Sequence, residues 1–430
     1  MSSSKTIRNI KYLIWLYFWL LLFEGAFRKW IVPQLSTPLL IVRDPVVIGA
    51  YFLAFKAGLF HKNLFTKLII VVGFISLSAG LFTVITAENN LAVTIFGFRT
   101  NFLHLPLIFL VPKVFDLDDV KKLGKWVLLL AAPMAILMIF QFNSSPDAFI
   151  NRGAGIEGMQ IESAGGKIRP PGTFSFITGA AQYFSLVTSF LVYGLVQSKI
   201  YPNWLLSTAG LSIVLALAIS GSRSAIGSVI TVLISLMVAL LIKPSLIGKS
   251  YKFIVLAAIV AFGVGYIPTF NQGLEVLNAR VETANDIEAD QGGIFGRFFD
   301  GFLEPFQHSE HIPLLGYGLG MGTNAGAGLL TGKAQFLLAE GEWARVVFES
   351  GLFIGVLYLL IKTGLVVLLG QMSAKSAFSG NTLPLLIFGS CAINILLGQI
   401  GQPTSLGFAA LGGGLCLAAC QSNHQQIQLR

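Results

Sequence analysis

Charged residues are scarce in this chain. Asp, Glu, Lys and Arg together make up 11% of the 430 residues, whereas 54% are hydrophobic, and the mean hydropathy is +0.76. A soluble protein of this length could not remove so much apolar surface from water, so the composition predicts a polytopic membrane protein. The net charge of +9 is explained below by the placement of basic residues around a membrane, and we do not expect nucleic acid as a partner.

Cysteine and histidine are also scarce. The cysteines Cys391, Cys416 and Cys420 all lie in apolar segments and predict neither a disulfide framework nor a metal cluster. His308 and His311 are three residues apart in a predicted loop, but the chain offers no clear third ligand, so we expect no metal site and no cofactor. Each of these two histidines is either a candidate proton acceptor or an ordinary surface side chain.

Apolar runs of membrane-spanning length predict an all-α fold with about twelve transmembrane helices in a single membrane domain, residues 1–430. The first run leads into Glu24 rather than a small-residue cleavage site, so we expect an uncleaved first span. Two long connections, 143–173 and 271–341, are predicted to emerge on the same side, the second between helices 9 and 10, with a short amphipathic helix around 279–299. The predicted spans lie near 10–30, 45–60, 64–86, 92–112, 123–142, 174–197, 203–220, 224–242, 251–270, 342–370, 382–400 and 404–421.

The basic residues predict the orientation in the membrane. The side that holds the N-terminus has 17 basic residues and three acidic ones, whereas the opposite side has more acidic residues than basic ones. Both termini are therefore predicted to be cytoplasmic and both long loops extracytoplasmic. Lysine predominates on the cytoplasmic side and arginine on the other. Because a guanidinium group can form two hydrogen bonds to one phosphate, the external arginines indicate either a phosphorylated ligand or pairing with the external carboxylates.

The stretch 314–355 is the strongest candidate for a site. It begins rich in glycine and continues as an apolar helix that carries Glu342, Arg345 and Glu349 on its first turns. At 100° per residue these side chains fall within roughly 60° of one another. They are either a catalytic base with an anion-binding group or ion pairs that satisfy each other. The glycines match no Walker or Rossmann signature, and a compact turn is their simplest role.

Three further arginines are candidates. Arg169 precedes Pro170 and Pro171, which stiffen the backbone, and it would be an anion clamp or an interfacial side chain that reaches to lipid headgroups. Arg223 lies in a tight external turn between two spans and needs a partner, either a ligand or a neighbouring carboxylate. Arg99 lies deep in the bilayer if the span 92–112 is straight, or in the interface if the span begins later.

The order of these features resembles the O-antigen ligase and O-antigen polymerase (Wzy-type) family of bacterial polysaccharide assembly. The resemblance rests on twelve spans, Arg169-Pro-Pro-Gly-Thr-Phe before the sixth, the turn Gly221-Ser-Arg-Ser, and a long external loop that closes with Gly316-Tyr-Gly-Leu-Gly. A span with Glu349-Ser-Gly-Leu-Phe-Ile-Gly follows. Ligases of this family typically carry a His-Asn motif after the glycines. Here that neighbourhood reads Gly322-Thr-Asn-Ala-Gly, without histidine, which favours a polymerase or a divergent relative.

The resemblance implies a GT-C-like, metal-independent, inverting glycosyltransferase in the bacterial cytoplasmic (inner) membrane, active on its outer face. The donor would be a sugar repeat unit on undecaprenyl pyrophosphate and the acceptor a glycan, with other polysaccharide assembly proteins as possible partners. Arg169 and Arg223 match arginines thought to bind the pyrophosphate, with Arg345 as a possible third. Glu342, then Glu349, is the predicted base. The alternatives are ligase-type transfer, a lipid-linked sugar flippase or exporter, and a non-catalytic assembly protein.

Overall fold

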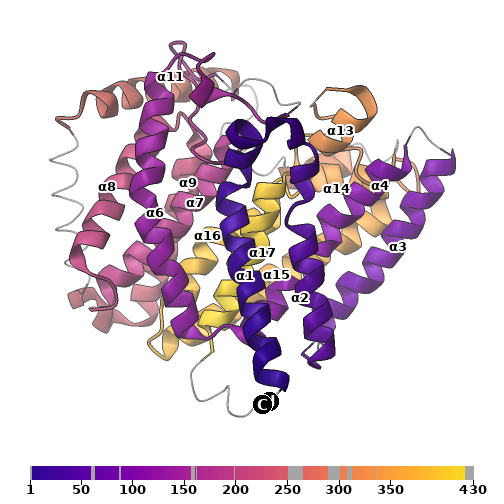
Figure 1. Ribbon diagram of the computed structural model, residues 1–430, viewed down its shortest axis with the longest axis horizontal. Coiled ribbons are helices and arrows are strands. Elements are labelled where there is room, and N and C mark those ends of the chain that lie inside the picture. Colours follow the sequence, from indigo (N-terminus) through magenta and orange to yellow (C-terminus); the bar gives the residue numbers. More distant parts are fainter. Residues whose placement is uncertain are drawn as a thin grey trace.

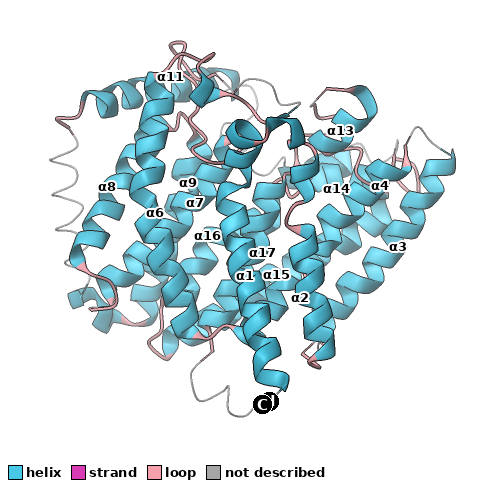
Figure 2. Cartoon of the chain, in the orientation of Figure 1, coloured by secondary structure: helices cyan, strands magenta, loops and turns pink. Residues whose placement is uncertain are grey.

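The structure of the protein is a computed structural model that describes residues 2–59, 63–86, 89–155, 160, 162–197, 199–249, 265–288, 301–307, 312–333 and 335–421. In these ranges no strand forms, and the chain is a bundle of helices joined by short loops (Figure 2). The α-helices are α1 (Ser2–Ala26), α2 (Asp44–Lys56), α3 (Leu64–Thr86), α4 (Leu91–Phe98), α5 (Leu107–Val114), α6 (Leu117–Asn143), α7 (Ile177–Val196), α8 (Asn203–Ile219), α9 (Arg223–Ile242), α11 (Pro268–Glu288), α13 (Asn324–Thr331), α14 (Glu342–Ser350), α15 (Leu352–Phe378), α16 (Leu383–Leu397) and α17 (Pro403–Ala419).

The apolar helices are those of a polytopic membrane protein. Among the described residues, seven helices are long and apolar enough to cross a membrane, and a bent pair adds an eighth. The helices α8, α16 and α17 are apolar but shorter. Of the predicted span 251–270, residues 251–264 lie outside the described residues. The predicted membrane architecture is therefore confirmed, whereas the number of twelve spans stays a prediction.

Two predicted spans are not continuous helices. The span 92–112 divides into α4, a π-helical turn η4 (Arg99–Leu103) and α5, with a bend of 42°. Pro106, which has no N–H to donate, lies at this break. The span 342–370 divides into α14 and α15 at Gly351, whose φ of 77° is left-handed. The predicted amphipathic helix of the long loop is α11, which begins earlier than predicted, at Pro268, and 289–300 lie outside the described residues.

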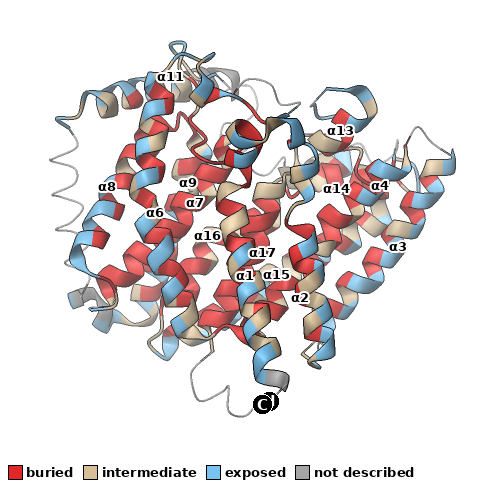
Figure 3. Ribbon diagram, viewed as in Figure 1, coloured by how far each residue is buried: buried red, intermediate tan, exposed pale blue. Residues whose placement is uncertain are grey.

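Small residues hold the centre of the bundle together. The helices α7 and α17 are buried over nearly their whole length, and both are surrounded by other helices (Figure 3). In α17, a Cβ added at Gly413 would lie 3.2 Å from Ile108 of α5, and one at Gly414 would lie 2.8 Å from Val111. Glycine thus lets these two helices approach closely, as is common between membrane helices.

The two ends of the bundle differ. At one end, α11 lies across the ends of α6 and α8, and α13 lies at the same end (Figure 1). We call this the α11 end. The opposite end holds the start of α1, the last turns of α5 and α15, and the lysines Lys113, Lys121 and Lys375. We call it the lysine-rich end. The described parts of the two loops predicted to be extracytoplasmic lie at the α11 end.

Candidate functional site

Two of the predicted arginines meet at the α11 end. Arg169 lies in the segment that leads into α7, and Arg223 is the first residue of α9. The turn before Arg223 contains Gly221, whose φ of 55° is left-handed. A Cβ added at Gly221 would lie 3.6 Å from the Cγ atom of Arg169, so the Arg169 side chain lies over this turn. Two distant loops therefore place their arginines side by side.

A third arginine, Arg280 of α11, joins them and was not predicted from the sequence. The helix α11 packs against α8, and a Cβ at Gly273 would lie 2.9 Å from the backbone of Ala218 near the end of α8. Gly273, buried Leu277 and Arg280 follow the helical spacing i, i+4, i+7, so they share one face. That spacing was readable in the sequence. What the sequence did not show is which element this face contacts.

We call Arg169, Arg223 and Arg280 the arginine cluster. Burial lowers the pKa of Arg169, and the positive charges of Arg280 and Arg223 lower it further. The Nε atom of Arg169 is buried and has no hydrogen-bond partner. Within the described part of the chain, neither Arg169 nor Arg280 forms an ion pair with a carboxylate. Three cations held close together favour a ligand with several negative oxygens, which would relieve their mutual repulsion.

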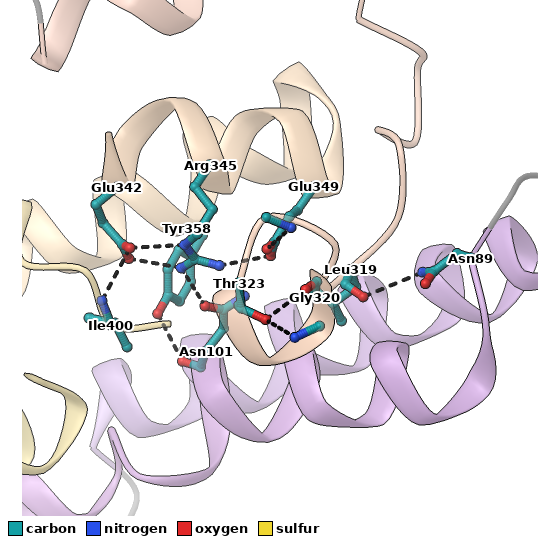
Figure 4. A network of polar contacts seen from close by, with 12 residues as sticks. Asn89, Asn101, Leu319, Gly320, Thr323, Glu342, Arg345, Glu349, Tyr358 and Ile400 are labelled. Carbon is teal, nitrogen blue, oxygen red and sulfur yellow. Dashed lines mark hydrogen bonds and ion pairs between the residues drawn. The ribbon is translucent and has the colours of Figure 1, made fainter. Parts of the chain in front are cut away.

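Glu342, Arg345 and Glu349 lie elsewhere, inside the bundle, and bond to one another (Figure 4). With Lys362 they form a buried ion network. The Nε atom of Arg345 donates to Glu342 Oε2 at 2.9 Å, and its Nη1 donates to Glu349 Oε2 at 2.8 Å. Its Nη2 donates to Glu342 Oε1 and to Asn101 Oδ1, both at 2.9 Å. Lys362 Nζ of α15 donates to Glu342 Oε1 at 3.0 Å. Two negative and two positive charges thus balance inside the bundle.

The buried ion network also joins three backbone segments. The carboxylate of Glu349 accepts from the N–H of Gly322 at 3.0 Å, and that of Glu342 accepts from the N–H of Ile400 at 3.2 Å. Asn101 ties the network to the π-helical turn η4. All three guanidinium nitrogens of Arg345 donate within the protein, so a phosphate bound there would compete with the carboxylates for this side chain. The catalytic roles of Glu342, Arg345 and Glu349 stay predictions, and this geometry favours a positioning role.

The glycine-rich segment held by this network is a compact turn. Gly316, Gly318 and Gly320 have φ angles of 74°, 131° and 91°, which favour glycine. A Cβ added at Gly320 would lie 2.2 Å from the carbonyl oxygen of Val93 in α4. The turn ends at Thr323, whose hydroxyl accepts from Gly326 N and caps α13. The segment therefore connects α4, α14 and α13 through its backbone.

Arg99 lies in the turn η4 and has a counter-ion. Its Nε is 2.8 Å from Asp44 Oδ2, and its Nη2 donates to Asp44 Oδ1 at 2.9 Å. Asp44 also contacts His104 Nε2 at 3.0 Å, and Tyr17 contacts the other ring nitrogen at 2.8 Å. The buried guanidinium is therefore compensated by a carboxylate, as its position requires. It lies in a separate cluster from Arg169, and its role as an additional site residue stays a prediction.

A small cavity of about 40 Å³ lies near the start of α13. Arg28, Asn324 and Gln402 are among its lining residues. The Oδ1 atom of Asn324 is buried and accepts no hydrogen bond. Gln402 also bonds to Thr178 at the start of α7, which links this cavity to the helix that follows Arg169. The cavity has room for about one water molecule, which these amides and the guanidinium could bind.

Two predicted site residues, His308 and His311, lie outside the described residues. Among the residues that the structure does describe, no three His, Cys, Asp or Glu side chains are grouped to hold a metal ion. No known family model matches the chain, and no curated protein is significantly similar to it.

Proposed function

We propose that the protein is a glycosyltransferase that joins sugar repeat units carried on a lipid pyrophosphate, undecaprenyl pyrophosphate in the family it resembles. The reaction would take place on the outer face of the bacterial cytoplasmic membrane. The observation that carries this proposal is the arginine cluster, in which Arg169, Arg223 and Arg280 come together from three separate segments at one end of the bundle. Their planar guanidinium groups match the oxygens of a pyrophosphate.

The proposed reaction needs a leaving group that the donor brings itself. The hydroxyl oxygen of the acceptor glycan attacks the anomeric carbon, and the glycosidic bond forms as the bond to the pyrophosphate oxygen breaks. Negative charge then grows on the pyrophosphate. Cations that are held in place before the reaction stabilise that charge more in the transition state than in the ground state. This is the role that we assign to the arginine cluster.

The hydroxyl proton must also leave. Glu342 and Glu349 are the bases predicted from the sequence, but each carboxylate already accepts hydrogen bonds from Arg345 and would have to give them up. In our proposal the proton passes to solvent water on the side of the acceptor as the glycosidic bond forms, and the released pyrophosphate keeps the negative charge, so the atoms balance without either carboxylate. The buried ion network then holds the glycine-rich turn and the start of α13 in place.

The experiment is a reconstitution of the purified protein in liposomes with a repeat unit linked to undecaprenyl pyrophosphate, without nucleotide and with a chelator. Chain extension with release of lipid pyrophosphate is the expected result, and it should fail in Arg169→Ala and Arg223→Ala. Transfer of the whole glycan to a different acceptor would indicate a ligase. Movement of the lipid across the bilayer without any new glycosidic bond would indicate a flippase and would contradict the proposal.

A further inference from the structure

A second cavity lies at the lysine-rich end, away from the arginine cluster. It has a volume of about 560 Å³ and lies where α3, α5, α15 and α17 meet. Ligand pockets in proteins commonly measure about 300–1,000 Å³. The helix α3, which reaches from this cavity toward the α11 end, has 23 residues and is roughly 35 Å long. The cavity is therefore a separate site from the one proposed for glycosyl transfer.

The walls of this cavity are mostly apolar. On one side the rings of Phe65 and Phe109 stack with their centroids 6.1 Å apart. Gly364 of α15 makes room for this wall, because a Cβ there would lie 3.2 Å from the Phe65 ring. Leu64 and Met372 line the cavity and are also exposed, so it opens to the surface of the bundle. An apolar hollow that opens on the surface of a membrane protein suits a hydrocarbon chain.

One charged residue lines the cavity. Lys113 lies in the last turn of α5 and is half-buried. It forms no ion pair with the described residues, whereas Lys121 on the same end pairs with Asp118 at 3.1 Å. The other polar lining residues are Asn63, Thr66 and Gln421. A half-buried basic group on the wall of an apolar cavity between helices matches the headgroup and the chain of an anionic lipid.

We propose that this cavity binds an anionic phospholipid, with an acyl chain between α3, α5 and α15 and the phosphate on Lys113. The composition of the lining carries this assignment, because a free phosphate would leave the apolar walls empty and an uncharged lipid would leave Lys113 unpaired. The site does not depend on the proposed glycosyl transfer.

The test is native mass spectrometry of the delipidated protein with phosphatidylglycerol or with phosphatidylcholine of the same acyl chains. We expect several-fold more bound phosphatidylglycerol in the unmodified protein and a loss of this preference in Lys113→Gln. The matched control is Lys375→Gln, an exposed lysine at the same end that does not line the cavity. Glycerol phosphate, which is a headgroup without chains, should not compete.

A second variant tests the apolar part of the site. Leu368→Trp places a larger side chain on the cavity wall and should lower the binding of both lipids, while thermal unfolding in detergent stays like that of the unmodified protein. Equal binding of the two lipids by the unmodified protein would overturn the proposal. So would an equal loss in Lys113→Gln and Lys375→Gln, because lipids that coat the whole surface would respond to any lysine at this end.

Discussion

Arg345 and Arg169 carry the same charge in opposite surroundings. Arg345 is buried and donates to two carboxylates and one amide, so its charge is compensated inside the protein. Arg169 is only partly buried, and its closest charges in the described residues are those of two other arginines. A compensated arginine holds structure together, whereas Arg169, beside two further positive charges, is placed to attract an anion. This contrast moves the candidate site from α14 to the arginine cluster.

Removal of Arg280 tests the member of the cluster that the sequence did not reveal. We expect Arg280→Ala to lower polymer formation by about 10²–10³, the usual cost of one lost donor to developing charge. The measurement is the rate of chain extension in the liposome assay. Arg152→Ala is the matched control, because Arg152 is an exposed arginine of the predicted external loop 143–173 that does not act on Arg169. Equal rates for the two variants would remove Arg280 from the site.

The buried ion network predicts a loss of stability when one charge is removed. Glu342→Gln leaves Arg345 and Lys362 with an excess of positive charge inside the bundle, and Lys362→Met leaves the opposite excess. Removing one partner of a buried ion pair typically costs about 3–5 kcal/mol. We expect each single variant to unfold at a markedly lower temperature in detergent.

The double variant Glu342→Gln/Lys362→Met separates the contribution of Glu342 to stability from a contribution to catalysis. It restores the charge balance, because Arg345 and Glu349 remain as a pair. Its destabilisation should therefore be smaller than the sum of the two single effects. If Glu342→Gln instead unfolds like the unmodified protein but forms no polymer, Glu342 is the base predicted from the sequence.

At the scale of the helices, Gly351 decides how α14 meets α15. Its φ of 77° is left-handed, and a Cβ there would lie 2.1 Å from the carbonyl oxygen of Leu314. We expect Gly351→Ala to shift α14 and lower thermal stability, because both the backbone angle and the contact oppose a side chain. The matched control is Gly227→Ala in α9, where no atom lies within 4 Å of the added Cβ. Equal unfolding temperatures for the two variants would contradict this account.

The sequence predicts the helices better than their breaks. Apolar length and few charges were enough to place α3, α6 and α9. The break at Gly351 involves a contact with Leu314, far away in the chain, and the break after η4 lies at Pro106, which the predicted span 92–112 did not take into account. The pairing of Glu342 with Arg345 was predictable from i, i+3 spacing, whereas Lys362 and Ile400 required the fold. Local pattern therefore predicts elements, and the site depends on how they pack.

At the scale of the whole molecule, charge separates the two ends. The arginine cluster and α11 lie at one end, and lysines such as Lys113, Lys121 and Lys375 lie at the other. Basic residues in short loops mark the cytoplasmic side of membrane proteins. The arginine cluster is accordingly expected outside the cytoplasm, where nucleotide sugars are absent and a donor must bring its own leaving group. The proposed use of a lipid pyrophosphate donor therefore depends on this orientation.

Labelling of introduced cysteines tests this orientation directly. Glu162→Cys and Lys333→Cys are exposed at the α11 end, and Lys375→Cys is exposed at the lysine-rich end. A maleimide that cannot cross membranes should label the first two in intact spheroplasts and the third only after permeabilisation. The unmodified protein is the blank, because Cys391 and Cys416 are buried and Cys420 is half-buried. The reverse pattern would place the arginine cluster in the cytoplasm, where a nucleotide sugar could serve as donor. The argument for a lipid pyrophosphate would then lose its basis, even though the cluster would still bind an anion.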